Sequence, residues 1–130
     1  MLSPDQNPLP EPTKLPSSHR LERLRQIIDK GLRQQPDLEE GRCGFVHLYG
    51  VAALCALLAI KRGLDQELCT TAGMLHDIWQ HKYYPVEDHA HLSAKEAEEI
   101  LVSCGGYAQE EIAIICDAIR NHCSTPIRDK

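Results

Sequence analysis

The stretch Met74-Leu75-His76-Asp77-Ile78 places an imidazole and a carboxylate side by side at the end of an apolar segment with helical spacing. Burying a charge or an unpaired polar ring is costly, so His76 and Asp77 need a partner. A metal ion is one such partner. Because consecutive helical residues point about 100° apart, we expect both side chains to meet on one ion only if it lies in the groove beside the helix.

Other segments could supply further ligands to such an ion. Four more histidines lie on or next to segments with helical character: His47, His89, His91 and His122. A single inward-facing histidine is more often a hydrogen-bonded core residue than a ligand. In combination with His76 and Asp77, the set favours a metal centre, because imidazole nitrogens and a carboxylate suit divalent transition metals.

Four blocks of sequence carry a resemblance to a known family. They are His47 with Val51-Ala52, then residues 72–78 (AGMLHDI), then residues 89–94 (HAHLSA) with Ala97 and Ile100-Leu101, and finally residues 118–122 (AIRNH). From about Phe45 to His122 the chain resembles the HD superfamily of metal-dependent phosphohydrolases. The resemblance implies an all-α fold, a single-domain helical bundle of about five main helices.

The resemblance also implies a ligand set. His47, His76 and Asp77 match the residues that hold the first ion in the family. His89 and His122 match histidines that bind a second ion in some branches and contact phosphate in others. We therefore expect one or two divalent ions, which could be Mn, Fe, Co, Ni, Zn or Mg, whereas His91 is less well aligned and is expected at the surface.

The implied activity is hydrolysis of a phosphate ester or anhydride of a nucleotide or similar small molecule, by attack of a metal-activated water. Asp77 would then serve catalysis as well as metal binding. Glu87 or Asp88 could orient the attacking water, as acidic residues in this loop do in some relatives. Lys82 and Arg120 are candidate phosphate contacts.

One departure from the family pattern keeps a second hypothesis open. The final metal-binding Asp of the family normally lies on a further helix beyond the last histidine. Here Asp129 is the one acidic residue after His122, close to the last residue, Lys130. The domain could lack the C-terminal helix of the family, and the alternative function is a degenerate HD domain that binds a ligand or partner without catalysis.

Composition sets limits on the remaining partners. The 130 residues carry a formal net charge of -5, which argues against broad DNA or anionic-membrane binding. Residues 1–16 contain five of the eight prolines and are expected to form a disordered tail before one domain over 17–130. No apolar run is expected to be long enough or charge-free enough to span a bilayer, and the sequence shows no CxxC pair and no secretory signal, so a soluble, cytoplasmic protein is expected. A homodimer is left open.

The apolar spacing also predicts individual helices. The first begins at Ser17 or Ser18, the second runs from Phe45 to Arg62, and the third follows an Asp65 cap as far as the His76-Asp77 dipeptide. The fourth begins at a Ser93–Glu96 capping box, although the family resemblance also allows an earlier start near His89, and the last runs from Tyr107 to His122. Residues 41–44 are expected to form a loop, and the helix over 45–62 is expected at the centre of the bundle because it is apolar nearly all round. The aromatic connection over 79–85 is either a packed loop or a wall for a nucleobase.

Overall fold

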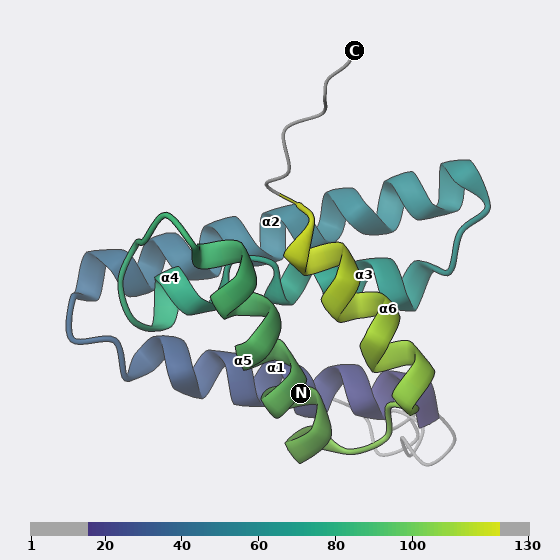
Figure 1. Ribbon diagram of the computed structural model, residues 1–130, viewed down its shortest axis with the longest axis horizontal. Helices are drawn as coiled ribbons and strands as arrows, with labels where there is room; N and C mark the ends of the chain where they lie inside the picture. The colour runs from purple at the N-terminus through teal and green to yellow at the C-terminus, as the bar shows by residue number, and fades with distance from the viewer. Residues whose placement is uncertain (1–15, 123–130) are drawn as a thin grey trace, which may run out of the picture.

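The structure of the protein is a computed structural model that describes residues 16–122, so the expected tail falls almost wholly outside it, as does Asp129. All regular structure in the described part is helical, as expected (Figure 1). The elements are α1 (Pro16–Arg33), α2 (Leu38–Arg62), α3 (Gln66–Leu75), α4 (Ile78–Lys82), α5 (His89–Cys104) and α6 (Gln109–Arg120). The short α4 replaces most of the aromatic loop that we expected.

The core lies where the inner stripes of the helices meet. On α1, the four-residue spacing of Leu24, Ile28 and Leu32 puts all three on one face, and each is at most 1% exposed. The other large members of the core come mainly from α3, α5 and α6: Met74, Leu75, Ile100, Leu101, Ile112, Ile115 and Ile119. The apolar side chains of these helices therefore face a common core.

Helix α2 begins earlier than the sequence suggested. Asp37 caps its first turn by accepting hydrogen bonds from the backbone nitrogens of the second and third helical residues, Glu39 and Glu40, at 3.0 and 3.1 Å. The expected loop over 41–44 is wrong, because Gly41 and Gly44 are buried helical residues. A Cβ on Gly44 would lie 3.0 Å from the Cβ of a buried histidine, His81, so the glycine allows α4 to pack directly on α2.

The orientation of α2 also differs from the prediction. Its buried face consists mainly of small residues, and one of them, Ala52, meets Gly73 so closely that a Cβ on Gly73 would lie 2.8 Å from its Cα. Its large apolar side chains face outward instead: Val46, Leu54, Leu57, Leu58 and Ile60 are all between 45% and 76% exposed. In Figure 1, α2 runs along the upper edge of the molecule and not through its centre.

Helix α2 is also more apolar than we expected when we excluded a membrane-spanning run. An 18-residue window within it has a mean hydropathy of 2.1, and 22% of that window is buried. By length and composition alone it could cross a membrane, so the expectation that no run is apolar enough is wrong. A single helix of this kind is weak evidence for a membrane protein.

The remaining helix ends follow ordinary capping chemistry, with one correction. Asp65 caps α3 through a 3.0 Å bond to the backbone nitrogen of Leu68, and Gly63 ends α2 in the left-handed region at φ 69°. Helix α5 begins at His89, so Ser93 is not its cap. Ser93 is fully buried inside the helix, and its hydroxyl accepts a 3.0 Å hydrogen bond from the backbone nitrogen of Trp79.

Arg20 on α1 links its own helix to two others. Its guanidinium donates to both carboxylate oxygens of Glu67 on α3, at 2.8 and 2.9 Å, and to both of Glu111 on α6, at 2.7 and 3.0 Å. These bidentate contacts are the geometry in which an arginine pair is strongest. Arg20 is 14% exposed, so the network is screened less than an ordinary surface ion pair.

Replacing Arg20 should therefore weaken the whole bundle. We expect Arg20→Ala to lower the free energy of unfolding by roughly 2 kcal/mol, between the values for exposed and buried ion pairs, because two carboxylates lose their shared counter-charge. Urea denaturation measures the change. The matched control is Arg25→Ala on the same helix, whose exposed pair with Glu22 should contribute less than about 1 kcal/mol. Equal losses in the two variants would contradict this account.

Candidate metal centre

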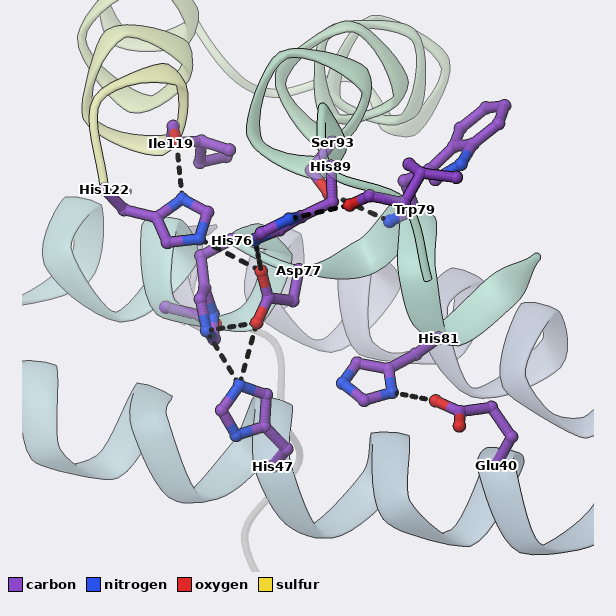
Figure 2. Close-up of polar contacts among 12 residues, drawn as sticks. Glu40, His47, His76, Asp77, Trp79, His81, His89, Ser93, Ile119 and His122 are labelled. Atoms are coloured by element: carbon purple, nitrogen blue, oxygen red, sulfur yellow. Dashed lines mark hydrogen bonds and ion pairs between the residues drawn. The ribbon is translucent and has the colours of Figure 1, made fainter. Parts of the chain in front are cut away.

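Five side chains from distant parts of the chain converge in one place (Figure 2). His47 lies on α2, while His76 and Asp77 join α3 to α4. His89 is the first residue of α5, and His122 lies two residues past the end of α6. The structure thus brings together all five residues that the sequence suggested as metal ligands.

The break between α3 and α4 occurs at the dipeptide itself. His76 keeps helical backbone angles (φ -61°, ψ -30°), whereas Asp77 has φ -123° and ψ 25°. The two side chains therefore meet at an interruption between two helices, and α3 ends at the dipeptide as the sequence predicted.

The carboxylate of Asp77 is shared between two pairs of imidazoles. Its Oδ2 lies 2.9 Å from Nε2 of His47 and 3.2 Å from Nε2 of His76. Its Oδ1 lies 3.0 Å from Nε2 of His122 and 3.3 Å from Nε2 of His89. Each oxygen thus belongs to its own group of three potential ligand atoms, and the carboxylate bridges the two groups.

The first group has the dimensions of one face of a coordination shell. The Nε2 atoms of His47 and His76 are 3.0 Å apart, so the three edges that they form with Asp77 Oδ2 measure 2.9, 3.0 and 3.2 Å. Two ligands that each lie about 2.1 Å from one ion, at tetrahedral or right angles, are roughly 3.0–3.4 Å apart. The residues present therefore fit a small divalent cation.

Backbone carbonyls orient three of the imidazoles so that Nε2, and not Nδ1, faces the carboxylate of Asp77. Nδ1 of His76 donates to the Gly73 carbonyl at 2.7 Å, that of His89 to the Val86 carbonyl at 3.1 Å, and that of His122 to the Ile119 carbonyl at 2.6 Å. A ring held through its Nδ1–H in this way offers a lone pair on Nε2 when a metal ion takes the place of the Nε2 proton. Metal-binding histidines generally have a partner of this kind on the second nitrogen.

Electrostatics keep Asp77 ionised. Burial acts to raise the pKa of Asp77, but hydrogen bonds from His76 and His47 and the charge of nearby His122 outweigh it and hold the pKa well below its usual range. Burial lowers the pKa of His76, but its hydrogen bonds to Asp77 and to the Gly73 carbonyl raise it by more. The carboxylate of Asp77 therefore carries a full negative charge, which faces the four imidazoles.

Access to the cluster is uneven. The side chain of His47 is 43% exposed, whereas those of His76 and Asp77 are 12% and 10% exposed. The side chains of His89 and His122 are 19% and 22% exposed. The side next to α2 is therefore the most open to solvent.

His81 belongs to this region, although sequence reasoning missed it. The residue is 5% exposed, its Nδ1 donates to Oε2 of Glu40 at 2.7 Å, and its ring centroid is 5.4 Å from that of His47. Its Nε2 is buried without a hydrogen-bond partner among the described residues, and in Figure 2 this nitrogen faces the His47–Asp77 cluster. The available signal was its spacing, four residues after Asp77 on α4.

Gln35 fixes the backbone that carries this histidine. Its side-chain amide donates to the carbonyl oxygens of His81, at 2.8 Å, and of Tyr83, at 3.3 Å. Gln35 is itself only 9% exposed, so the C-terminal end of the short α4 helix is held from the α1–α2 connection. Such a buried amide restricts the orientation of the His81 backbone.

Two cations suggested as phosphate contacts lie in ion pairs elsewhere. Lys82 pairs with Glu96 on α5, and its ammonium lies 5.1 Å from the centroid of the Tyr83 ring. Arg120 pairs with Asp117 on the same helix at 2.6 Å. Neither residue belongs to the two groups around Asp77.

The acidic residues suggested for water activation lie just before α5. Glu87 and Asp88 are exposed, and Oδ1 of Asp88 accepts a 2.9 Å hydrogen bond from Nδ1 of His91. The side chain of His91 is 64% exposed, which confirms its expected place at the surface. In the described part of the chain, Asp77 is the only carboxylate in either candidate metal group.

The aromatic side chains after the dipeptide pack on one another. The ring centroids of Trp79 and Tyr83 are 4.4 Å apart, and Tyr84 meets Trp79 edge-on at 6.1 Å. In Figure 2 the indole of Trp79 points away from Asp77. The contacts favour the packed-loop interpretation over a nucleobase wall at the metal centre.

Comparison with known proteins gives one match. A family model described as the HD domain matches residues 44–129. No curated protein and no solved structure matches the chain. The matched region contains all five clustered side chains.

The bridging position of Asp77 predicts the metal content of variants. We expect the wild-type protein to bind about two equivalents of manganese or zinc, one for each carboxylate oxygen, and His122→Ala to keep about one. Asp77→Ala should bind neither ion, because both groups lose their shared ligand. Elemental mass spectrometry after dialysis measures the ratio, and circular dichroism checks that the variants remain helical.

The control variant is His91→Ala, which removes an exposed histidine close to the cluster in sequence and should keep the wild-type metal content. Undiminished metal in Asp77→Ala would rule out this carboxylate as the bridge.

Proposed function

The chain belongs to the HD domain family, and on this premise we propose that it is a metal-dependent phosphohydrolase acting on a nucleotide or similar small phosphate ester or anhydride. The family is generally one of metal-dependent hydrolases. The proposal for this chain goes further, because it names the bond that is cleaved and the class of substrate.

One observation carries the proposal. Four imidazoles present their Nε2 atoms to the two oxygens of one ionised carboxylate, and three of them are fixed by backbone carbonyls. A cluster that served only packing would not need this convergence, since each buried ring could be satisfied by a single hydrogen bond. The arrangement suits a pair of divalent ions at the separation that a bridging carboxylate allows.

Bound metal ions and protein side chains would have different roles in the reaction. Divalent ions in this cluster would supply a water of lowered pKa and neutralise charge on the phosphoryl group. His47, His76 and Asp77 would hold one ion, and His89 and His122 would complete the other site with the same carboxylate. The substrate would approach past His47, the most exposed of the five.

We assign the orientation of the attacking water to His81. Because Nδ1 of His81 donates to Glu40, the neutral ring keeps an acceptor lone pair on Nε2, which faces the cluster. A carboxylate–histidine pair of this kind fixes the tautomer of a general base. His81 is not in either group of metal ligands, so it is free to accept a hydrogen bond from the water that attacks phosphorus.

A second candidate function rests on a specific feature of the ligand set. Asp77 is the only acidic ligand among the clustered residues that the structure describes. A degenerate HD domain that binds a phosphorylated ligand without turning it over would have the same metal content. Turnover therefore has to be measured separately from metal binding.

The direct test is hydrolysis of a panel of nucleotides and simple phosphate esters by the manganese-loaded protein. We expect turnover that is lost on chelation and falls by more than about 100-fold in Asp77→Ala, since the ions lose their bridge. His91→Ala should retain wild-type rates. Metal-loaded protein with no turnover on any member of the panel would favour the degenerate domain, and full activity in Asp77→Ala would refute the proposed site.

The Glu40–His81 pair gives a sharper prediction. Glu40→Gln should reduce kcat roughly 100-fold with little change in KM or metal content, because an amide can donate to Nδ1 and move the ring proton to Nε2. Nitrogen-15 NMR of the histidine rings should show that change of tautomer independently of activity. The matched control is Glu39→Gln, whose side chain is exposed one residue earlier on α2.

If Glu40→Gln shows the tautomer change but keeps full kcat, His81 does not orient the water, whatever the outcome for Asp77.

Cytoplasmic location and a nucleotide as the substrate remain predictions from the sequence.

A further inference from the structure

The outward face of α2 has the residue spacing of a helix-pairing seam. Six exposed residues, which we call the α2 seam, follow one another at alternating intervals of three and four: Cys43, Val46, Gly50, Ala53, Leu57 and Ile60. This is the a/d spacing of a coiled coil. Leu54 and Leu58, which are 61% and 45% exposed, widen the apolar surface beside it.

Nothing in the described part of the molecule covers this seam. Val46 is 76% exposed, Leu57 63% and Ile60 61%, and they lie on the same side of one helix. Isolated exposed apolar residues are ordinary, but a continuous apolar stripe along a helix marks an interaction surface. The opposite side of α2 already provides its contacts to α3 and α4, so the seam is available to a partner.

The order of residues along the seam is self-complementary. If two copies of α2 cross in opposite directions about a point between Gly50 and Ala53, then Gly50 faces Ala53 of the other copy. Val46 then faces Leu57, and Cys43 faces Ile60. The large residues Val46 and Leu57 thus meet on either side of the crossing point, and the smallest residues meet at the crossing point itself, where two backbones approach most closely. A two-fold symmetric interface requires this kind of match.

The charges at the two ends of α2 favour the same direction. Asp37 and Glu39 are exposed at the start of α2 and outnumber Arg42 beside them, whereas Lys61 and Arg62 lie in the last turn. Antiparallel pairing brings the acidic end of one helix to the basic end of the other, while parallel pairing would put like ends together. We propose that the α2 seam binds the α2 seam of a second copy of this chain, as an antiparallel homodimer.

Steric space at Gly50 makes the proposal testable without harming the monomer. A Cβ added to Gly50 would meet no atom within 4 Å, so a larger side chain there should leave the fold intact. At a close crossing between two helices, however, the same side chain would force them apart. For any looser apolar association, or for a membrane surface, the added apolar group would strengthen binding.

The experiment is sedimentation equilibrium of the full chain from micromolar to hundreds of micromolar concentration. We expect the wild type at twice its chain mass of 14.6 kDa, and both Gly50→Leu and Leu57→Asp as monomers with unchanged metal content. The matched control is Ile114→Asp on α6, which replaces a residue that is 56% exposed away from the seam and should remain dimeric.

A cross-link tests the direction of pairing. In Ile60→Cys, the new thiol should form an intermolecular disulfide with Cys43, an exposed free cysteine, under mild oxidation, and Ile60→Cys combined with Cys43→Ser should not. A wild type that is monomeric throughout, a dimer that survives both seam variants, or a monomer that binds phosphatidylcholine vesicles through the seam would each overturn the proposal. None of these results depends on the phosphohydrolase activity.

Discussion

A buried carboxylate that must be compensated is the constraint on which the rest of this structure depends. Asp77 is ionised and 7% exposed, and its charge is balanced by four imidazoles that come from α2, α5, the end of α3 and the segment after α6. An unpaired charge at this depth would be prohibitively costly, so these elements have to meet here. The same requirement creates a set of converging nitrogen and oxygen atoms that a divalent ion can bind.

Helix α2 explains how a small domain serves both this site and an outer surface. Its inner face is built from small residues, so α3 and α4 pack close enough for His47 to reach Asp77 and for Glu40 to reach His81. Because that face is occupied by glycine and alanine, most of the large apolar residues of the helix are left on the outside. Close packing at the metal centre and an exposed apolar seam are thus two consequences of one sequence pattern.

The helical spacing of the apolar residues predicted the all-α fold, and the resemblance to the HD superfamily, anchored on the His76-Asp77 dipeptide, implied the five clustered side chains. It failed where three-dimensional context decides. Gly41 and Gly44 suggested a loop because glycine weakens helices, yet here they permit close helix contacts. The Glu40–His81 pair joins residues 41 positions apart, which no local pattern reveals. A helix that is apolar all round also gives no indication of which face is buried.

The central claim is that Asp77 bridges two metal sites, and anomalous X-ray diffraction from crystals grown with manganese tests it most directly. The account predicts two anomalous peaks, one between Asp77 Oδ2 and the nitrogens of His47 and His76, and one between Oδ1 and those of His89 and His122. Manganese bound elsewhere, or no anomalous signal at Asp77 under saturating manganese, would contradict it.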